Sequence, residues 1–222
     1  MLHFSDMPTA PSTDIKRTVL DRVEAARGWA WTPADFADLG SRPAVDKVLQ
    51  RLAASGALRR IDRGLYDHPR LNPLTGRLAV PDYRAIIDAI ARRDQIRVLV
   101  DGMTAANDLG LTTAVPAKIE AFVDARLRPI HLGQQEIRFR PTTPSRLYWA
   151  GRPGMRIVQA LHWLQQSIDD PIERGRVYAT LTRILTDQHH GAAMREDLRS
   201  GFSALPIWMQ EFMRPLLTAA DL

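Results

Sequence analysis

Apolar positions in the first part of the chain recur at the three- and four-residue spacing of an amphipathic helix. The positions that share this face are Ile15, Val19, Leu20 and Val23. The spacing predicts a first helix that Ser12 or Thr13 can cap and that Gly28 ends. Before it, polar or small residues lie around Pro8 and Pro11, so we expect 1–11 to form a flexible arm.

Two further helices are predicted next, each with its own start and stop signals. Thr32 followed by Pro33 is an N-cap before proline at the first helical position, and Gly40 ends the short helix. Ser41 caps the following helix, which Gly56 terminates. The residues that share its apolar face are Val45, Val48, Leu49 and Leu52.

A hairpin is predicted after these helices. In the segment ALRRIDRGLYDHPR, apolar residues flank a turn at Asp62, Arg63 and Gly64. Asn72 and Pro73 mark the start of a linker. Helix, turn, helix and basic hairpin together are the outline of a winged helix-turn-helix over residues 12–72, a module that binds DNA.

The pattern changes at Asp82, and we expect a second domain over residues 81–222. The elements expected are a helix from Asp82, a short strand near 97–100, a helix over 103–109, a strand at 121–123 and a strand pair over 128–132 and 137–140. After Met155 the pattern is wholly helical. The predicted fold class is α+β: an N-terminal winged helix-turn-helix, then a mixed α/β domain with a helical C-terminal region.

Composition narrows the classes of function. The chain has 222 residues, of which 45% are hydrophobic and 25% charged, enough for one large or two small domains. No apolar run approaches the roughly 20 residues that span a bilayer, and the N-terminus does not resemble a signal peptide. The absence of cysteine excludes disulfides, thiol catalysis and thiolate metal sites. We therefore expect a cytoplasmic protein with no membrane partner.

Positive charge favours an anionic partner, more through its local distribution than through the net charge of +5. From Ser41 to Arg70 there are seven Lys or Arg residues and three Asp residues. The third predicted helix and the hairpin would carry most of them. The candidate residues for contact with double-stranded DNA are Thr32, Ser41, Arg42, Lys47, Gln50, Arg51, Arg59, Arg60 and Arg63.

Two other interpretations of these charges remain open. They can form a solvated helix face, and a winged helix can serve as a protein–protein interaction module without binding DNA. The order of helix, glycine, helix and basic hairpin favours DNA binding. A homodimer is a candidate assembly, because twofold pairing lets two recognition helices meet successive major grooves.

The residues also resemble a known family. GALRRIDRGLYDHP after a helix-turn-helix looks like the wing of AbiEi-type antitoxin regulators, which belong to type IV abortive-infection toxin–antitoxin systems. DGMTAANDLGLTTAVP is similar to their next domain, and the resemblance covers roughly residues 12–140. It implies an N-terminal winged domain that represses its own operon. It also implies a C-terminal part that counters a nucleotidyltransferase-like toxin, a cognate partner protein.

An enzyme is the second class of function to weigh. His189, His190 and Asp187 could be metal ligands, but adjacent histidines on a helix point about 100° apart. Asp101 could be a catalytic carboxylate, although capping the helix after it is the favoured role. There is no HExxH, GxSxG or Walker pattern. We predict no catalytic residue, no metal site and no cofactor.

A pure interaction protein is the third class. The terminal segment PIWMQEFMRPLL is rich in large apolar side chains, which suit a protein interface. Ordinary core packing explains them as well and is favoured.

Overall fold

The protein is mixed α and β. The structure, a computed structural model, describes residues 15–219, and it divides into two compact units, Met1–Gln95 (unit 1) and Ile96–Leu222 (unit 2). The arm expected at 1–11 and the caps expected at Ser12 or Thr13 lie outside the described residues.

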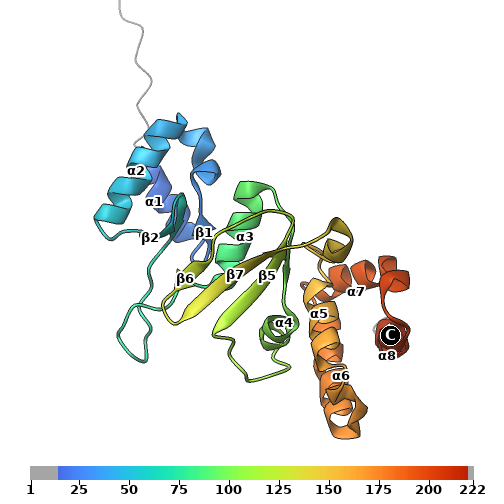
Figure 1. Ribbon diagram of the computed structural model, residues 1–222. Coiled ribbons are helices and arrows are strands. Elements are labelled where there is room, and N and C mark those ends of the chain that lie inside the picture. Colours follow the sequence, from blue (N-terminus) through green and yellow to red (C-terminus); the bar gives the residue numbers. More distant parts are fainter. Residues whose placement is uncertain (1–14, 220–222) are drawn as a thin grey trace, which may run out of the picture. The chain divides into compact units, whose positions relative to one another are not determined.

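Unit 1 contains helices around a small sheet (Figure 1). Its elements are α1 (Ile15–Ala25), β1 (Ala30–Trp31), the 3₁₀ helix η1 (Pro33–Leu39), α2 (Arg42–Ala54), β2 (Arg59–Asp62), β3 (Leu65–Asp67) and α3 (Tyr83–Asp94). The sheet has the order β1-β3-β2, and both pairings are antiparallel. The predicted hairpin is therefore confirmed, with Gly64 in the left-handed region (φ 64°) at its turn.

One apolar cluster holds α1, η1, α2 and the hairpin together. The residues buried in it include Val19, Val23, Phe36, Leu49, Leu58 and Tyr66. The first helix contributes two of them, η1 one, and the hairpin region two. Burial of each such side chain contributes about 1.5–3 kcal/mol to the stability of the fold. Three short helices depend on this contribution, which they obtain by packing together.

Unit 1 differs from the expectation in three places. The short helix after Thr32 is 3₁₀ rather than α, because Phe36 has non-helical backbone angles (φ −124°, ψ 18°) inside it. Ala30 and Trp31 form a strand because they pair with Asp67 and Tyr66. The helix from Tyr83, expected at the start of the second domain, belongs to unit 1, where Ile86 and Ile90 are buried.

Unit 2 begins with a four-stranded sheet. Its elements up to residue 147 are β4 (Val98–Val100), α4 (Gly102–Asp108), β5 (Lys118–Val123), β6 (Ile130–Leu132), β7 (Gln135–Pro141) and the 3₁₀ helix η2 (Pro144–Leu147). The strand order is β4-β5-β7-β6; β5 and β7 are parallel and the other pairs antiparallel. The expected strands and the strand pair around Gly133 are confirmed.

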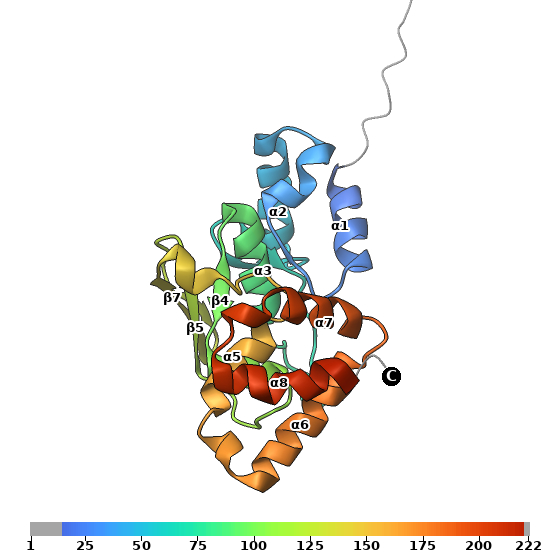
Figure 2. The ribbon, with the colours of Figure 1, turned by 90° about the vertical axis from the view of Figure 1, so that its right-hand side faces the viewer.

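The predicted helical region is also confirmed. It contains α5 (Met155–Leu164), η3 (Ser167–Asp169), α6 (Pro171–Leu185), α7 (Gly191–Ser200), η4 (Phe202–Ala204) and α8 (Ile207–Ala219). Helix α6 packs against α7 and α8 (Figure 2). In the terminal segment Phe212, Met213 and Leu216 are buried, so core packing accounts for most of its apolar side chains.

A glycine sets the close packing of α4 on α5. A Cβ atom at Gly102 would lie 2.6 Å from the Trp163 Cβ and 2.7 Å from the Gln159 carbonyl oxygen. No side chain fits at that distance, so any larger residue would push α5 away. The position of α5, and of the polar side chains it carries, therefore depends on Gly102.

Candidate nucleic-acid interface

The outward face of α2 carries the centre of the candidate site. Val45 and Leu49 are fully buried and fix how the helix is turned. Because an α-helix completes a turn in 3.6 residues, Lys47, Gln50 and Arg51 lie on the opposite side, and all three are exposed. The sequence predicted this face from the apolar spacing alone, and the structure brings the three side chains together on it.

The N-terminus of α2 is open. Ser41 is the N-cap in an extended conformation, and its side chain makes no capping hydrogen bond. Ser41, Arg42 and Pro43 are exposed. Pro43 has no N–H, and the Val45 N–H donates to the Ser41 carbonyl oxygen at 3.0 Å. The N–H groups of Arg42 and Ala44 are therefore the ones that this end of the helix can offer to phosphate oxygens, at the positive end of the helix dipole.

Arg42 lies at the flank of this face and is paired. Its Nε atom donates to both carboxylate oxygens of Asp46, each at 3.1 Å, and the two side chains are 64% and 38% exposed. An exposed pair four residues apart on a helix contributes only about 0.3–0.5 kcal/mol. A phosphate can therefore compete with Asp46 for Arg42 at small cost.

The hairpin presents two further arginines to solvent. Arg60 lies on the exposed side of β2, and Arg63 is exposed at the turn. The Arg63 carbonyl oxygen accepts a hydrogen bond of 3.1 Å from Nη1 of Arg93 on α3. The backbone of the turn is thus supported from α3 while the Arg63 side chain faces outward.

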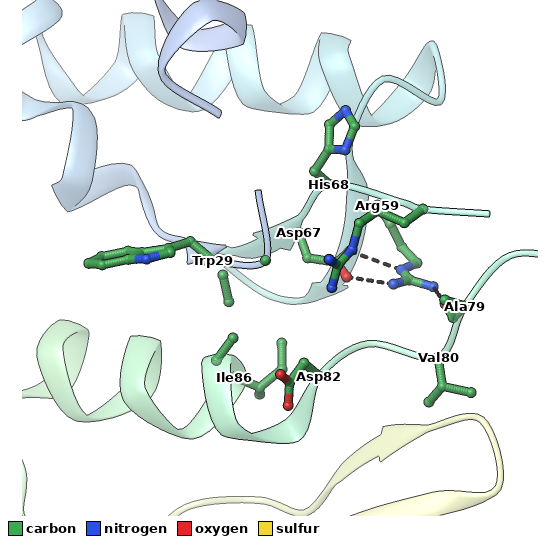
Figure 3. A pocket seen from close by; sticks show the side chains of 12 residues that line it. Trp29, Arg59, Asp67, His68, Ala79, Val80, Asp82 and Ile86 are labelled. Carbon is green, nitrogen blue, oxygen red and sulfur yellow. Dashed lines mark hydrogen bonds and ion pairs between the residues drawn. The ribbon is translucent and has the colours of Figure 1, made fainter. Parts of the chain in front are cut away.

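Arg59, a candidate DNA contact in the sequence prediction, is held by structural partners. Its guanidinium donates to Asp67, with Nε 2.9 Å from Oδ1, and to the Ala79 carbonyl oxygen at 2.7 Å (Figure 3). The two charged side chains are only 25% and 12% exposed. Arg59 joins β2 and β3 to the segment before α3, so its role is structural. Its partners lie eight and twenty residues away in the chain, a distance over which residue spacing gives no signal.

Thr32, another candidate DNA contact, also has a structural partner. It is 1% exposed, and both its backbone N–H and its hydroxyl donate to the Asp35 carboxylate, at 2.7 and 3.0 Å. A buried N-cap with a carboxylate against it repels phosphate rather than binding it. The threonine followed three residues later by an acid is the capping-box pattern, which could have identified this role from the sequence.

Other residues considered for chemistry have structural partners. Asp101 caps α4 by accepting from the Thr104 backbone N–H at 2.9 Å, and it also accepts from the Glu120 N–H at 3.0 Å. Asp187 accepts from the backbone N–H groups of His189 and His190 in the turn before α7. Over residues 15–219, no group of three or more His, Cys, Asp or Glu side chains could hold a metal ion. Within the same range, no helix has the length and apolar character needed to cross a membrane.

Comparison with known proteins gives the family of this chain. A model of a family of unknown function, DUF6088, matches residues 18–188, so the chain belongs to that family. Among solved structures, it is similar to the crystal structure of the RV2827C protein from Mycobacterium tuberculosis, with 18% identity and a TM-score of 0.39 over 93% of this chain and 77% of that one. A likeness at that TM-score gives no information on function. No curated protein shows significant similarity.

Proposed function

We propose that this member of the DUF6088 family is a DNA-binding transcriptional regulator, and that residues 15–95 form a winged helix-turn-helix. The observation that carries the proposal is the outward face of α2. Lys47, Gln50 and Arg51 are exposed there beside an uncapped helix N-terminus. Exposed basic side chains and free N–H groups on one helix are what recognition of duplex DNA requires.

In this proposal α2 lies in the major groove. Gln50 and Arg51 can make bidentate hydrogen bonds to base edges, glutamine to adenine and arginine to guanine. Lys47 and the N–H groups after Ser41 contact phosphates. Two copies of the chain would place their α2 helices in successive major grooves of a palindromic operator.

The β2–β3 hairpin is the wing. Its exposed arginines, Arg60 and Arg63, lie along the phosphate backbone or reach into the minor groove, where a narrow groove attracts arginine. The contact between Arg93 and the Arg63 carbonyl oxygen supports the turn from the protein side.

The resemblance to AbiEi-type regulators extends the proposal to a biological role. The regulator would repress its own operon, and unit 2 would counter a nucleotidyltransferase-like toxin encoded beside it. The support is the wing phrase GALRRIDRGLYDHP and the later DGMTAANDLGLTTAVP. No catalytic residue is part of this proposal.

DNA binding is tested by fluorescence anisotropy with tiled duplexes from the region upstream of the protein's own reading frame. We expect one duplex to bind in preference to the others, with affinity that falls as salt rises. Lys47→Ala with Arg51→Ala should weaken binding and reduce the slope of log K against log salt by about 1, because Lys47 is the proposed phosphate contact and about one counterion is released per phosphate contact.

The matched control is Arg183→Ala with Arg174→Ala, which removes the same charge from exposed positions on α6. It should leave both affinity and slope unchanged. Equal losses in the two double variants, or no salt-dependent complex with any duplex, would refute the proposed interface.

The antitoxin part is tested separately by co-expression with the product of the adjacent gene. Rescue of growth by the full chain and by Lys47→Ala with Arg51→Ala would place antitoxin activity outside the DNA-contacting face. Failure of the full chain to rescue growth would end the antitoxin proposal and leave DNA binding untouched.

One observation favours a second function, a protein–protein interaction module. Four aliphatic side chains in the loop between β3 and α3 are more than half exposed: Leu71, Leu74, Leu78 and Val80. Leu74 is 94% exposed. Several exposed apolar side chains within one short loop can form a patch of the kind that marks interaction sites. Suppose that Leu74→Ser abolished rescue of growth in the co-expression assay and that Lys47→Ala with Arg51→Ala left it unchanged. The interaction module would then be the correct interpretation.

A further inference from the structure

Unit 2 contains an open groove that neither the DNA proposal nor the AbiEi resemblance uses. It lies where strands β4 and β5 meet η2, α5 and the segment before α8. Its cavity volume is about 880 Å³. Pockets for small ligands enclose roughly 300–1,000 Å³, so the groove has room for a ligand of nucleotide size.

The groove is positively charged. Arg97 and Arg146 line it, and no Asp or Glu is among its lining residues. Arg97 pairs with Asp124 through its backbone N–H and its Nε atom, both at 3.0 Å, which directs the carboxylate to one edge of the guanidinium. Arg146 is exposed and has no ion pair within residues 15–219. An anion entering the groove therefore meets one guanidinium without a competing carboxylate.

Flat aromatic side chains lie beside these charges. Phe122 on β5 stands opposite Leu99 on β4, and the Arg146 guanidinium lies 5.7 Å from its ring centroid. Tyr148, 44% exposed, meets Trp149 edge-on at 5.3 Å. The guanidinium of Arg152 stacks on both rings, at 4.5 and 4.6 Å, and this stacking fixes the wall that they form.

Arg152 is itself held in place. Its Nε atom donates to Asp197 Oδ1 at 2.8 Å, and an Nη2 hydrogen bond reaches the Asp197 carbonyl oxygen at 3.1 Å. The aromatic wall is therefore positioned before any ligand arrives, which lowers the entropy cost of binding.

Two polar side chains on α5 complete the groove. Gln159 and His162 are three residues apart and so lie on one face of the helix, where both line the space. Partial burial lowers the pKa of His162 below its usual value, so the ring is neutral near pH 7 and offers one donor and one acceptor. An amide and a neutral imidazole can match the mixed donors and acceptors on the edge of a nucleobase.

We infer that this groove binds a nucleoside phosphate, with the phosphate at Arg146 and Arg97 and the base against Phe122 or Tyr148. Stacking on an aromatic side chain and a charge-assisted hydrogen bond to arginine are the two contacts that recognise this class. The same chemistry is offered by a free nucleotide and by one unit of a single strand. The inference does not depend on duplex binding by unit 1.

The experiment is isothermal titration of the full-length chain with AMP, GMP, CMP and UMP, and with adenosine and inorganic phosphate as partial ligands. We expect saturable binding of at least one nucleotide, and binding at least about tenfold weaker for each partial ligand, which lacks either the charge or the ring. Arg146→Gln should weaken nucleotide binding by about tenfold or more, since the charge-assisted hydrogen bond is lost.

Arg183→Gln, on the exposed face of α6, is the matched control and should bind as the unaltered chain does. Phe122→Leu and Tyr148→Leu each remove one ring, and at least one of them should weaken nucleotides more than inorganic phosphate; circular dichroism confirms that each variant is folded. No saturable binding at about 5 mM, where even a millimolar site would be mostly filled, overturns the inference. Equal affinity in Arg146→Gln, or inorganic phosphate binding as tightly as a nucleotide, also overturns it.

A five-nucleotide single strand identifies the source of the ligand. Tighter binding of the strand than of its mononucleotides, lost in Arg146→Gln, assigns the groove to single-stranded nucleic acid. Equal affinities assign it to a free nucleotide. Duplex binding by Arg146→Gln should equal that of the unaltered chain, whether or not unit 1 binds duplex DNA. This measurement therefore separates the groove from unit 1.

Discussion

Arginines on β7 of unit 2 and at the exposed side of the unit 1 hairpin have different partners. In unit 2, Arg138 and Arg140 on β7 pair with Glu136 and Glu120, at 2.6 and 3.1 Å. In unit 1, Arg60 and Arg63 stay exposed at the hairpin, with no carboxylate paired to them among the described residues. The number of arginines on a sheet therefore says little about affinity for a polyanion. What matters is whether the fold supplies each one with a carboxylate.

The contrast continues within a single strand. Arg59 and Arg60 are neighbours in β2, but successive side chains of a strand point to opposite faces. Arg59 reaches Asp67 and Ala79, while Arg60 points to solvent. Arg59 therefore stabilises the hairpin, and Arg60 is left exposed to solvent.

Breaking the structural pair should have the largest effect. Asp67→Ala leaves Arg59 partly buried without its carboxylate, and the free energy of unfolding should fall by about 3 kcal/mol. Glu120→Ala, which breaks an exposed pair in unit 2, should cost less than about 1 kcal/mol. Urea denaturation of both variants measures this; equal losses would mean that Arg59 is no more structural than Arg140.

Removing exposed arginines should affect DNA binding next most strongly. Arg60→Ala with Arg63→Ala should weaken binding by roughly tenfold to a hundredfold at low salt and reduce the salt slope by about 2. Arg138→Ala with Arg140→Ala removes the same charge from β7 and should leave binding unchanged. Anisotropy titrations at several salt concentrations compare the two; a similar loss in both would point to net charge rather than to the hairpin.

A smaller effect is expected from releasing a paired arginine. Asp46→Asn frees Arg42 at the edge of the α2 face and removes a negative charge there, so DNA affinity should rise about twofold, which corresponds to the free energy of an exposed charge pair. Glu120→Gln frees Arg140 in the same manner and should give no gain. A decrease in affinity for Asp46→Asn would show that the pair holds Arg42 in a productive position.

The smallest effect concerns pH. A hydrogen bond from Arg22 holds the pKa of Asp38 below its usual 3.8, and one from Arg97 does the same for Asp124 in unit 2. Since the folded-state pKa is the lower one, each pair stabilises the protein above pH 3.8 and loses that contribution as pH falls further. Asp38→Asn should thus be slightly less stable than the unaltered chain at pH 6, and the difference should be smaller at pH 2.5. Denaturation midpoints at the two pH values test this, and a difference that did not shrink in acid would exclude the ion pair as its cause.

Local patterns predicted the elements and the outward face of α2, because both depend on residues close in the chain. Val45 and Leu49 face the core, so Lys47 and Gln50 must face away, and the glycine at position 64 marks the turn of the hairpin. The same reasoning found the Asp101 cap. Each of these signals spans fewer than about five residues, the range over which helix and turn geometry operates.

Long-range pairing accounts for what could not be predicted. The strand at Ala30 and Trp31 exists only because β3 lies beside it. Arg59 looked like a wing residue until Asp67 and Ala79 were seen next to it. The sequence also could not predict that Arg146 lacks an ion pair, because this depends on which carboxylates other parts of the chain bring near it.

The Arg59 contact with Ala79 also sets the smallest piece of the protein that can be expected to fold by itself. The sequence predicts that the first domain ends at residue 72. A fragment ending there would lose the Ala79 carbonyl oxygen, which accepts a hydrogen bond from Arg59, and would lose all of α3. A fragment ending at Gln95 keeps both, together with Arg93 behind the turn. A minimal fragment made to test the proposed DNA binding should therefore extend to Gln95.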